Sequence, residues 1–333
     1  MNAPTVNEKV KPLQGKTIVI TGASSGAGRA AAIEMASRGA DVVLAARRQE
    51  ALLEVATECE ALGVRALVVV ADVKEAAAIN NLASVAKEWG GKIDVWINNA
   101  GVLAAGAFDE TPLAVHEAIV QINLLGYIKG AHAVLPVFKE QGHGILINNI
   151  SVGGWFPTPY AAGYSASKFG LRGFGEALQG ELHSWPDIHV CNLYPAFLDT
   201  PGIQHAGNYT GKVLKPAPPV YNPRQVAKAM AHLVLHPKGT TVAGGVSTLL
   251  RIAHALAPGL SRRITAGVME TYFKSADSIA LTDGNLFLPS EFGTSIYGGW
   301  STPATQKQKL AFSALVISGI AIGLGLLLKK SAR

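Results

Sequence analysis

Short apolar runs alternate with longer helical stretches along most of this chain, and no other feature restricts its fold as strongly. The runs are rich in valine, isoleucine and leucine and are predicted strands: Lys16–Thr21, Asp41–Ala46, Arg65–Val70, Ile93–Ile97, Gly144–Ile150, Ile188–Leu193 and Thr240–Gly244. Because a helical stretch separates most successive strands, the strands run parallel and right-handed crossovers put helices on both faces. We therefore predict an α/β fold with a doubly wound parallel sheet of about seven strands.

The composition agrees with a folded domain of this kind. Apolar residues make up 49% of the chain and charged residues 16%, so a substantial core can be buried. The net charge of +6 is spread without an aromatic-interleaved basic patch, so no nucleic-acid partner is expected. Cys59 and Cys191 lie far apart, which favours a reducing compartment over a disulfide framework. The nine histidines show no paired ligand spacing, so no metal site is predicted.

The first predicted strand runs directly into a glycine-rich turn, and a helix follows. Glycines without a Cβ let the backbone turn tightly and approach a pyrophosphate. The start of the helix offers unpaired N–H groups and the positive end of its dipole. This strand–turn–helix context predicts a dinucleotide site. The predicted contacts are Thr21, Gly22, Ser24, Ser25, Gly26, Ala27 and Gly28.

This turn, TGASSGAG, resembles the cofactor turn of the classical short-chain dehydrogenases/reductases, and further motifs of that family follow in order. They are Asp72-Val73, Asn98-Asn99-Ala100-Gly101, Asn123, Ser151 and Tyr164-Ser-Ala-Ser-Lys168, in a resemblance that covers about residues 12–250. The resemblance implies a Rossmann-like fold and hydride transfer between a nicotinamide cofactor and a carbonyl or alcohol. It also implies cofactor contacts at Asp72 and Val73 beside the adenine and, farther along, at Asn99, Ala100, Gly101, Tyr164, Lys168, Pro195, Leu198 and Thr200.

The end of the second predicted strand indicates which nicotinamide cofactor binds. NAD enzymes place an acidic side chain there for the ribose hydroxyls, but Ala46 occupies the expected position and Arg47 and Arg48 follow. A guanidinium binds a 2′-phosphate through charge-assisted hydrogen bonds. We therefore predict NADPH/NADP+, with Arg47 as the main phosphate ligand and Ser24 as a second one. The alternative is that both arginines are solvated charges at a helix start.

Tyr164 and Lys168 are four residues apart in a predicted helix, so they lie on the same face. A free phenol has a pKa of ~10, and a nearby ammonium favours the phenolate, so we expect a lowered pKa at Tyr164. Tyr164 can then exchange a proton with the substrate oxygen. Ser151, at the carboxyl end of a strand, can hydrogen-bond that oxygen. The family resemblance adds Asn123, which completes a proton relay with Lys168 through water.

The predicted catalytic domain, residues 13–250, is flanked by segments of different character. Residues 1–12 form a charged, proline-containing tail without a signal-peptide core. Residues 251–306 lose the alternation and are predicted to form an irregular extension on the substrate side, close to a membrane. Residues 307–333 contain Leu310–Leu328, 19 residues without a charge. At ~1.5 Å each they can cross a hydrocarbon core of about 30 Å. We predict one C-terminal transmembrane helix; a buried core helix is the alternative.

Loops past the strand ends supply candidates for the substrate pocket, namely Val152–Tyr160, Phe197 and Ile203–Tyr221. Trp155, Phe156, Tyr160 and Phe197 are expected to form its apolar wall. An apolar pocket beside a membrane helix predicts a small lipid-like carbonyl or alcohol as substrate. NADPH must reach the site, so the catalytic domain is expected to face the cytoplasm.

Two other interpretations of the chain remain open. One is a non-catalytic NADP(H)-binding membrane scaffold or redox sensor, against which the intact set of Asn123, Ser151, Tyr164 and Lys168 argues. The other is a soluble oligomeric reductase whose apolar tail is buried at an interface. The long predicted helices, residues 112–139 and 161–183, resemble those that pair subunits in the family and imply a homodimer or homotetramer.

Overall fold

A computed structural model describes residues 10–300 of the chain. The predictions for residues 1–9 and 301–333, including the transmembrane helix Leu310–Leu328, lie outside the described residues.

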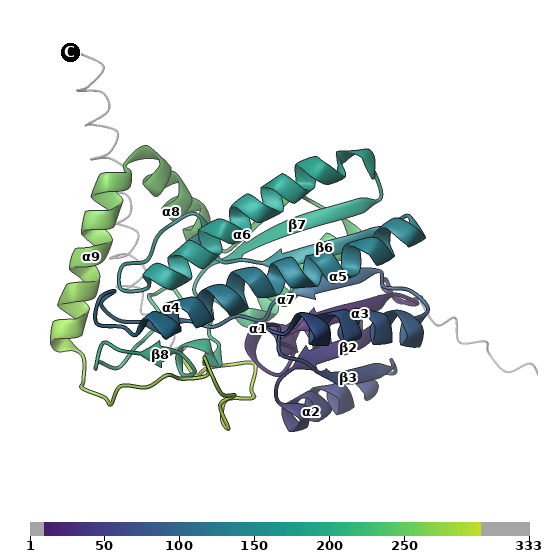
Figure 1. Cartoon of the computed structure of the whole chain (residues 1–333), viewed down its shortest axis with the longest axis horizontal. Helices are drawn as coiled ribbons and strands as arrows, with labels where there is room; N and C mark the ends of the chain where they lie inside the picture. The colour runs from purple at the N-terminus through teal and green to yellow at the C-terminus, as the bar shows by residue number, and fades with distance from the viewer. Residues whose placement is uncertain (1–9, 301–333) are drawn as a thin grey trace, which may run out of the picture.

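A seven-stranded sheet forms the centre of the molecule (Figure 1). Its strands, in spatial order, are β3 (Ala66–Val70), β2 (Asp41–Ala46), β1 (Thr17–Thr21), β4 (Val95–Asn98), β6 (Gly144–Asn149), β7 (Ile188–Pro195) and β9 (Thr240–Ala243). Every neighbouring pair is parallel, as the sequence predicted. The strand order reverses at β1, between β2 and β4. In such sheets, the crevice at the carboxyl ends of the strands beside this reversal binds ligands.

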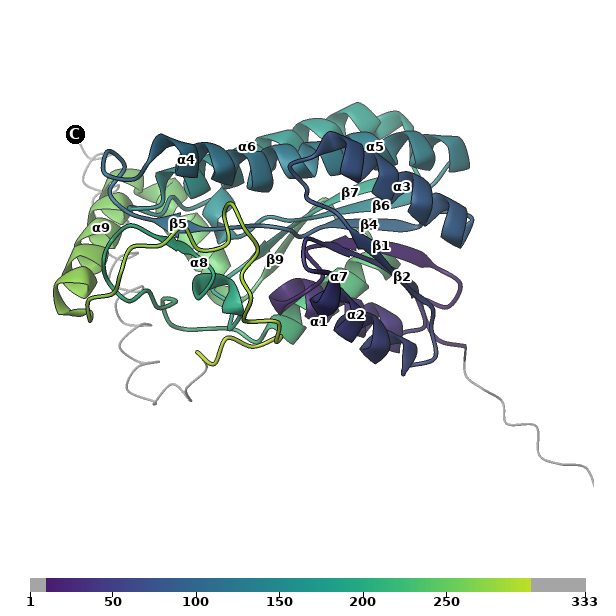
Figure 2. The ribbon, with the colours of Figure 1, turned by 60° about the horizontal axis from the view of Figure 1, so that its bottom comes forward.

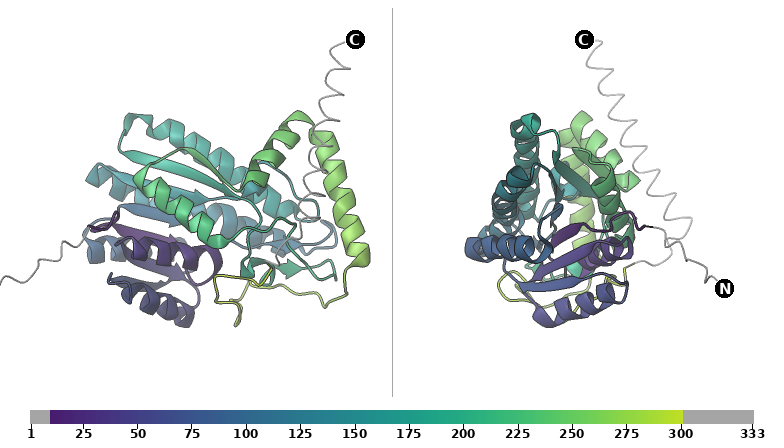
Figure 3. Two further views of the ribbon diagram at one scale, coloured as in Figure 1. Left: turned by 180° about the vertical axis from the view of Figure 1, so that it is seen from behind. Right: turned by 90° about the vertical axis from the view of Figure 1, so that its right-hand side faces the viewer.

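Helices cover both faces of the sheet (Figure 2). One face carries α1 (Gly26–Ser37), α2 (Gln49–Glu60) and α7 (Pro223–Leu235), which Figure 3 shows from behind in purple, blue and green. The other face carries α3 (Ala76–Gly90), α4 (Leu113–Val120), α5 (Gly126–Gln141) and α6 (Ala162–Glu181). Successive side chains of a strand point to opposite faces of the sheet and pack against the two helical layers in turn. In β1, Ile18 and Ile20 pack toward α1 and α7, and Val19 packs toward α3 and α5. Burial on both faces explains the continuous apolar character of the strands.

The single long helix predicted for Pro112–Lys139 is interrupted by a π-helical turn, Gln121–Leu125, between α4 and α5. The whole run, Leu113–Gln141, is the one described helix that is long and apolar enough to cross a membrane. Half of its most apolar window is buried inside the protein, and it packs against α3 and α6. It is therefore a layer of this fold and gives little support for a membrane span.

The prediction of an irregular extension is wrong for its first part. Residues after β9 form α8 (Gly245–Leu256) and α9 (Pro258–Ser275), which pack against each other beyond the carboxyl ends of the strands (Figure 1). Pro258 and Gly259 begin α9, where proline is favourable because its fixed φ suits the first helical turn. Two short strands, β5 (Ala104–Ala105) and β8 (Gly207–Asn208), form a separate small sheet.

Residues 277–300 follow α9 without a helix or strand of their own, and we call them the strap. The strap leaves the lower end of α9 and returns across the molecule toward α1 and β2 (yellow in Figures 1 and 2). Leu286 is fully buried and Ile296 nearly so, and these two side chains anchor the strap at separate points. The extension therefore folds back onto the first strands of the domain.

Candidate active site

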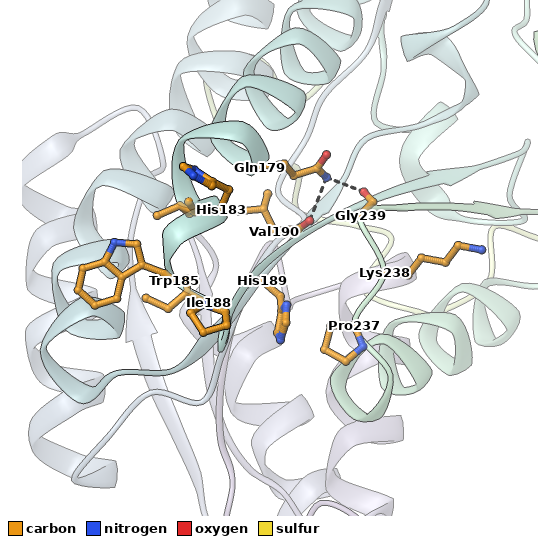
Figure 4. Close-up of a pocket in the computed structure, with 11 residues that line it drawn as sticks. Gln179, His183, Trp185, Ile188, His189, Val190, Pro237, Lys238 and Gly239 are labelled. Carbon is orange, nitrogen blue, oxygen red and sulfur yellow. Dashed lines mark hydrogen bonds between the residues drawn. The ribbon is translucent and has the colours of Figure 1, made fainter.

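A cavity of about 900 Å³ opens at the carboxyl ends of the strands, where the strand order reverses. Most of the residues predicted for the site line it: Gly22, Ser24, Ser25, Gly26, Ala27, Arg47, Asp72, Val73, Asn99, Ala100, Gly101, Ser151, Tyr164, Lys168, Pro195, Leu198 and Thr200. Thr21, Gly28 and Asn123 are not among the lining residues. A second, smaller hollow of about 320 Å³ lies near the amino ends of β7 and β9, around Gln179, and contains none of these residues (Figure 4).

The glycine-rich turn is held by close contacts that leave no room for side chains. A Cβ at Gly28 would overlap the carbonyl oxygen of Gly22, and a Cβ at Gly22 would lie 2.7 Å from the Cα of Ala100. Thr21 Oγ1 accepts a hydrogen bond from the backbone N–H of Asn99 at 3.0 Å and donates to Ile97 O. Thr21 and Gly28 therefore shape the turn from behind, while Gly22, Ser24, Ser25, Gly26 and Ala27 line the cavity.

The basic end of the cavity contains Arg47 and Arg48 beside Asp72. Burial is the main cause that lowers the pKa of Arg47, and the nearby Asp72 opposes this shift. Within the described residues, Nη1 of Arg47 is buried and has no hydrogen-bond partner. The side-chain oxygens of Asn149 and Asn285 are likewise buried and unpartnered, and both residues line the cavity. A buried donor and two buried acceptors fit a ligand that carries a phosphate and hydroxyl or amino groups, as an adenine dinucleotide does.

Ser151, Tyr164 and Lys168 meet where β6 ends and α6 begins. Ser151 follows β6 with φ at 128°, a strained conformation for a residue other than glycine, and its Oγ accepts from Gly153 N at 3.1 Å. The side chain of Ser151 lies close enough to Tyr164 to lower the pKa of its phenol. The Nζ of Lys168 lies 5.6 Å from the centre of the Tyr164 ring and 5.3 Å from that of Tyr127. The group combines a phenol, a hydroxyl and an amine around one point of the cavity, which suits proton transfer to or from a substrate oxygen.

The pKa of Tyr164 differs from the value that the sequence led us to expect. Burial raises the pKa of Tyr164, and the nearby Ser151 side chain only partly offsets this shift. Burial also lowers the pKa of Lys168 to about 7. The expected lowering of the Tyr164 pKa by Lys168 is therefore wrong for the protein by itself. Burial disfavours the Tyr164 phenolate and the Lys168 ammonium by more than the attraction between these two charges favours them.

Asn123 lies in the π-helical turn, fully buried behind the cavity. Its Oδ1 accepts from Val102 N at 2.8 Å, and its Nδ2 donates to Val102 O at 2.8 Å and to Ser167 Oγ at 3.2 Å. These bonds tie the loop after β4 to α6. The described contacts do not bring Asn123 to Lys168 directly, so its place in a proton relay stays a prediction.

The apolar wall of the cavity is only partly the predicted one. Phe156 and Phe197 line it, but Trp155 and Tyr160 do not. Trp155 is stacked between the guanidinium groups of Arg172 and Arg251, at 3.5 and 4.1 Å from its ring centre, and so fastens α8 to α6. Tyr160 packs edge-on against Phe273 of α9 at 5.1 Å.

The sequence predicted an extension on the substrate side, but it identified none of the extension residues that line the cavity. Leu250 of α8, several residues of α9 and part of the strap line the cavity; those of α9 and the strap are Ile264, Thr265, Val268, Met269, Tyr272, Phe273, Asn285, Pro289 and Ser290. The amphipathic spacing within α9 carried a usable signal, because Thr265, Val268, Met269 and Tyr272 recur at helical intervals of three and four residues. No comparable signal marks the strap residues.

Comparisons with known proteins agree with this geometry. A family model described as short chain dehydrogenase matches residues 16–208. The uncharacterised oxidoreductase YxnA of Bacillus subtilis is 34% identical over 266 residues, which cover 78% of this chain and 74% of that protein. The 3-ketodihydrosphingosine reductase of Bos taurus is 30% identical over 298 residues, which cover 84% and 90%. A solved structure of a variant actinorhodin polyketide ketoreductase with NADPH is 28% identical, with a TM-score of 0.63, covering 70% of this chain and 97% of that one.

The chain belongs to the short-chain dehydrogenase family. It is therefore an oxidoreductase that acts on an alcohol or a carbonyl group with a nicotinamide cofactor.

Proposed function

We propose that this protein is an NADPH-dependent reductase of a carbonyl group on a lipid-like substrate. The observation that carries the proposal is the form of the cavity. Ser151, Tyr164 and Lys168 line it together with apolar side chains of α8 and α9. A buried polar reaction centre inside an apolar chamber suits a substrate with one polar group on a hydrocarbon body.

Reduction adds a hydride to the carbonyl carbon and a proton to its oxygen, and the reduced nicotinamide supplies the hydride when it is bound. Tyr164 donates the proton, and Ser151 stabilises the charge that develops on the oxygen by donating a hydrogen bond. The raised pKa of Tyr164 keeps its phenol protonated and ready to donate at neutral pH. With a pKa of about 7, Lys168 exchanges a proton at neutral pH and can restore the proton on Tyr164.

The preference for NADPH rests on Arg47, whose unpartnered Nη1 is buried at the end of the cavity. Ser24 lines the same cavity and is proposed as a second phosphate ligand. The NADPH in the similar ketoreductase structure supports this choice. The relative named for 3-ketodihydrosphingosine supports a keto lipid as substrate.

The membrane anchor at residues 310–328, a catalytic domain on the cytoplasmic side and a homo-oligomer remain part of this proposal. Carbonate extraction of membranes tests the anchor, because a spanning helix stays in the pellet whereas a protein held only by surface contacts is released.

The full chain in detergent micelles provides the test of activity. NADPH oxidation would be followed with 3-ketodihydrosphingosine, a β-ketoacyl lipid and, as a polar comparison, a ketose. We expect turnover of at least one keto lipid, none of the ketose, and loss of turnover in Tyr164→Phe. Tyr160→Phe is the matched control, because it removes the same hydroxyl outside the cavity.

Turnover of the ketose alone would contradict the proposed substrate class. Tight NADPH binding without turnover of any lipid would favour the non-catalytic scaffold instead.

A further inference from the structure

The strap supplies main-chain acceptors to the basic end of the cofactor cavity. Arg47 Nη2 donates to Asn285 O at 2.6 Å, and Arg48 Nη1 donates to Ser290 O at 3.0 Å and to Phe292 O at 2.9 Å. The strap thus holds both guanidinium groups that follow β2, although some 240 residues separate them in the sequence.

The same segment reaches the glycine-rich turn. Gly26 N donates to Ser295 O at 3.0 Å, and Arg29 Nη1 donates to Thr294 O at 2.9 Å. Arg29 also pairs with Glu54 and Glu58, so its charge is already neutralised. Arg47 differs, because within the described residues its only hydrogen bond is to an uncharged carbonyl oxygen, and Asp72 acts on it only as a nearby charge. The cavity therefore keeps beside the strap an oriented guanidinium that is not hydrogen-bonded to any described carboxylate.

Polar atoms of the strap itself point to a ligand at this end. Asn285 lines the cavity, and its Oδ1 is buried without a partner among the described residues. Pro289 and Ser290 line the same end. A buried unpartnered acceptor costs free energy unless a ligand supplies a donor, and Asn285 lies next to the unpartnered donor of Arg47.

We propose that the strap is part of the cofactor site, with Asn285 as a ligand of the adenosine end of NADP(H) and with strap displacement required for cofactor exchange. This inference rests on the proposed use of NADPH. In it, the main chain at residues 285–292 orients Arg47 and Arg48 for the 2′-phosphate and closes the cavity over the adenosine.

The way in which the strap is fastened makes displacement of its middle part feasible. Leu286 and Ile296 are buried at the two anchors, and His205 Nε2 is hydrogen-bonded to Phe292 O at 3.0 Å between them. The stretch between the anchors is exposed, with Leu288 at 76% and Phe292 at 59% of full exposure. An exposed arch between two anchors has few packing contacts to lose when it lifts.

Two glycines allow the strap to be disturbed with a matched control. Gly293 has φ at +72°, and a Cβ there would overlap the ring of His205. Gly293→Ala therefore displaces the strap between Leu286 and Ile296 from its contact with His205. Gly299 has φ at +77° with no atom near its Cβ position, so Gly299→Ala adds the same backbone strain without the clash. Asn285→Ala removes the proposed ligand and leaves the main-chain carbonyl in place.

The experiment measures cofactor binding by the full chain in detergent micelles, with no substrate present. NADPH fluorescence gives the dissociation constant, and a chase with excess NADP+ gives the dissociation rate. We expect Gly293→Ala to release NADPH about tenfold faster than Gly299→Ala, because the closing contacts are lost. We expect Asn285→Ala to weaken NADPH binding about fivefold, the usual effect of losing one buried hydrogen bond, without lowering the melting temperature of the cofactor-free protein.

Equal release rates in the two glycine variants, together with unchanged NADPH affinity in Asn285→Ala, would overturn the inference and leave the proposed function intact. Failure of the unaltered protein to bind either NADPH or NADH would overturn both. If Gly293→Ala does not fold, the affinity of Asn285→Ala decides the question alone.

Discussion

Replacing Arg47 by alanine tests the choice of cofactor most directly. The substitution removes the buried Nη1 that has no partner among the described residues, together with the Nη2 that donates to Asn285 O. A hydrogen bond to a charged group contributes about 1.5–3 kcal/mol. At about 1.4 kcal/mol per tenfold change, loss of the 2′-phosphate contact corresponds to a ~12- to ~140-fold reduction in kcat/KM for NADPH.

The quantity to compare is the ratio of kcat/KM for NADPH to that for NADH. Losing the bond to the strap weakens both cofactors, so this loss cancels in the ratio, whereas the phosphate contact exists only for NADPH. We expect this ratio to fall by the full ~12- to ~140-fold in Arg47→Ala. Arg65→Ala is the control, since Arg65 pairs with Asp41 on the exposed surface and its loss removes the same charge. An equal loss with both cofactors in Arg47→Ala would refute the assignment of Arg47 to the 2′-phosphate.

Two further predictions concern the reaction centre and the cavity wall. Burial lowers the pKa of Lys168 from 10.5 to about 7, so between these values the unfolded chain binds more protons and stability rises with pH. In thermal melts without cofactor, Lys168→Met should be more stable than the unaltered protein near pH ~7, and the difference should shrink toward pH ~10; a constant difference would contradict this origin. Met269→Trp fills part of the cavity wall on α9, so kcat/KM for long-chain keto lipids should fall about tenfold while a short-chain ketone is spared. Equal losses for both chain lengths, measured with the same cofactor, would place Met269 outside the path of the lipid chain.

The sheet and its helices could be predicted from sequence because apolar periodicity determines which segments are buried. Asp41–Ala46 is observed with the predicted bounds, and α6 (Ala162–Glu181) lies within the helix predicted for residues 161–183. The cavity position followed from topology, since motifs at the carboxyl ends of parallel strands must meet at one edge. Ser151, Tyr164 and Lys168 meet there for this reason.

Other features depend on interactions without a sequence pattern. The strap is held largely by main-chain carbonyls, such as those of Asn285 and Ser290, and any residue type presents a carbonyl. The direction of the Tyr164 pKa depends on its burial, which only the packed structure defines. Trp155 was assigned to the cavity because aromatic loops often line pockets, but two arginines from separate helices, Arg172 and Arg251, hold it elsewhere.

The contact between Arg29 and Thr294 spans 265 residues, so the helix after the glycine-rich turn is synthesised long before the strap that contacts it. At ribosomal speeds of about 5–20 residues per second, roughly 13–53 s pass between synthesis of Arg29 and of Thr294. During that interval a nascent chain can already have completed every strand of its sheet, because β9 ends at Ala243. If the strap closes the site as proposed, nucleotide capture is a late event in biogenesis, and a chain that stops after β9 would carry the motifs of its family with an open site.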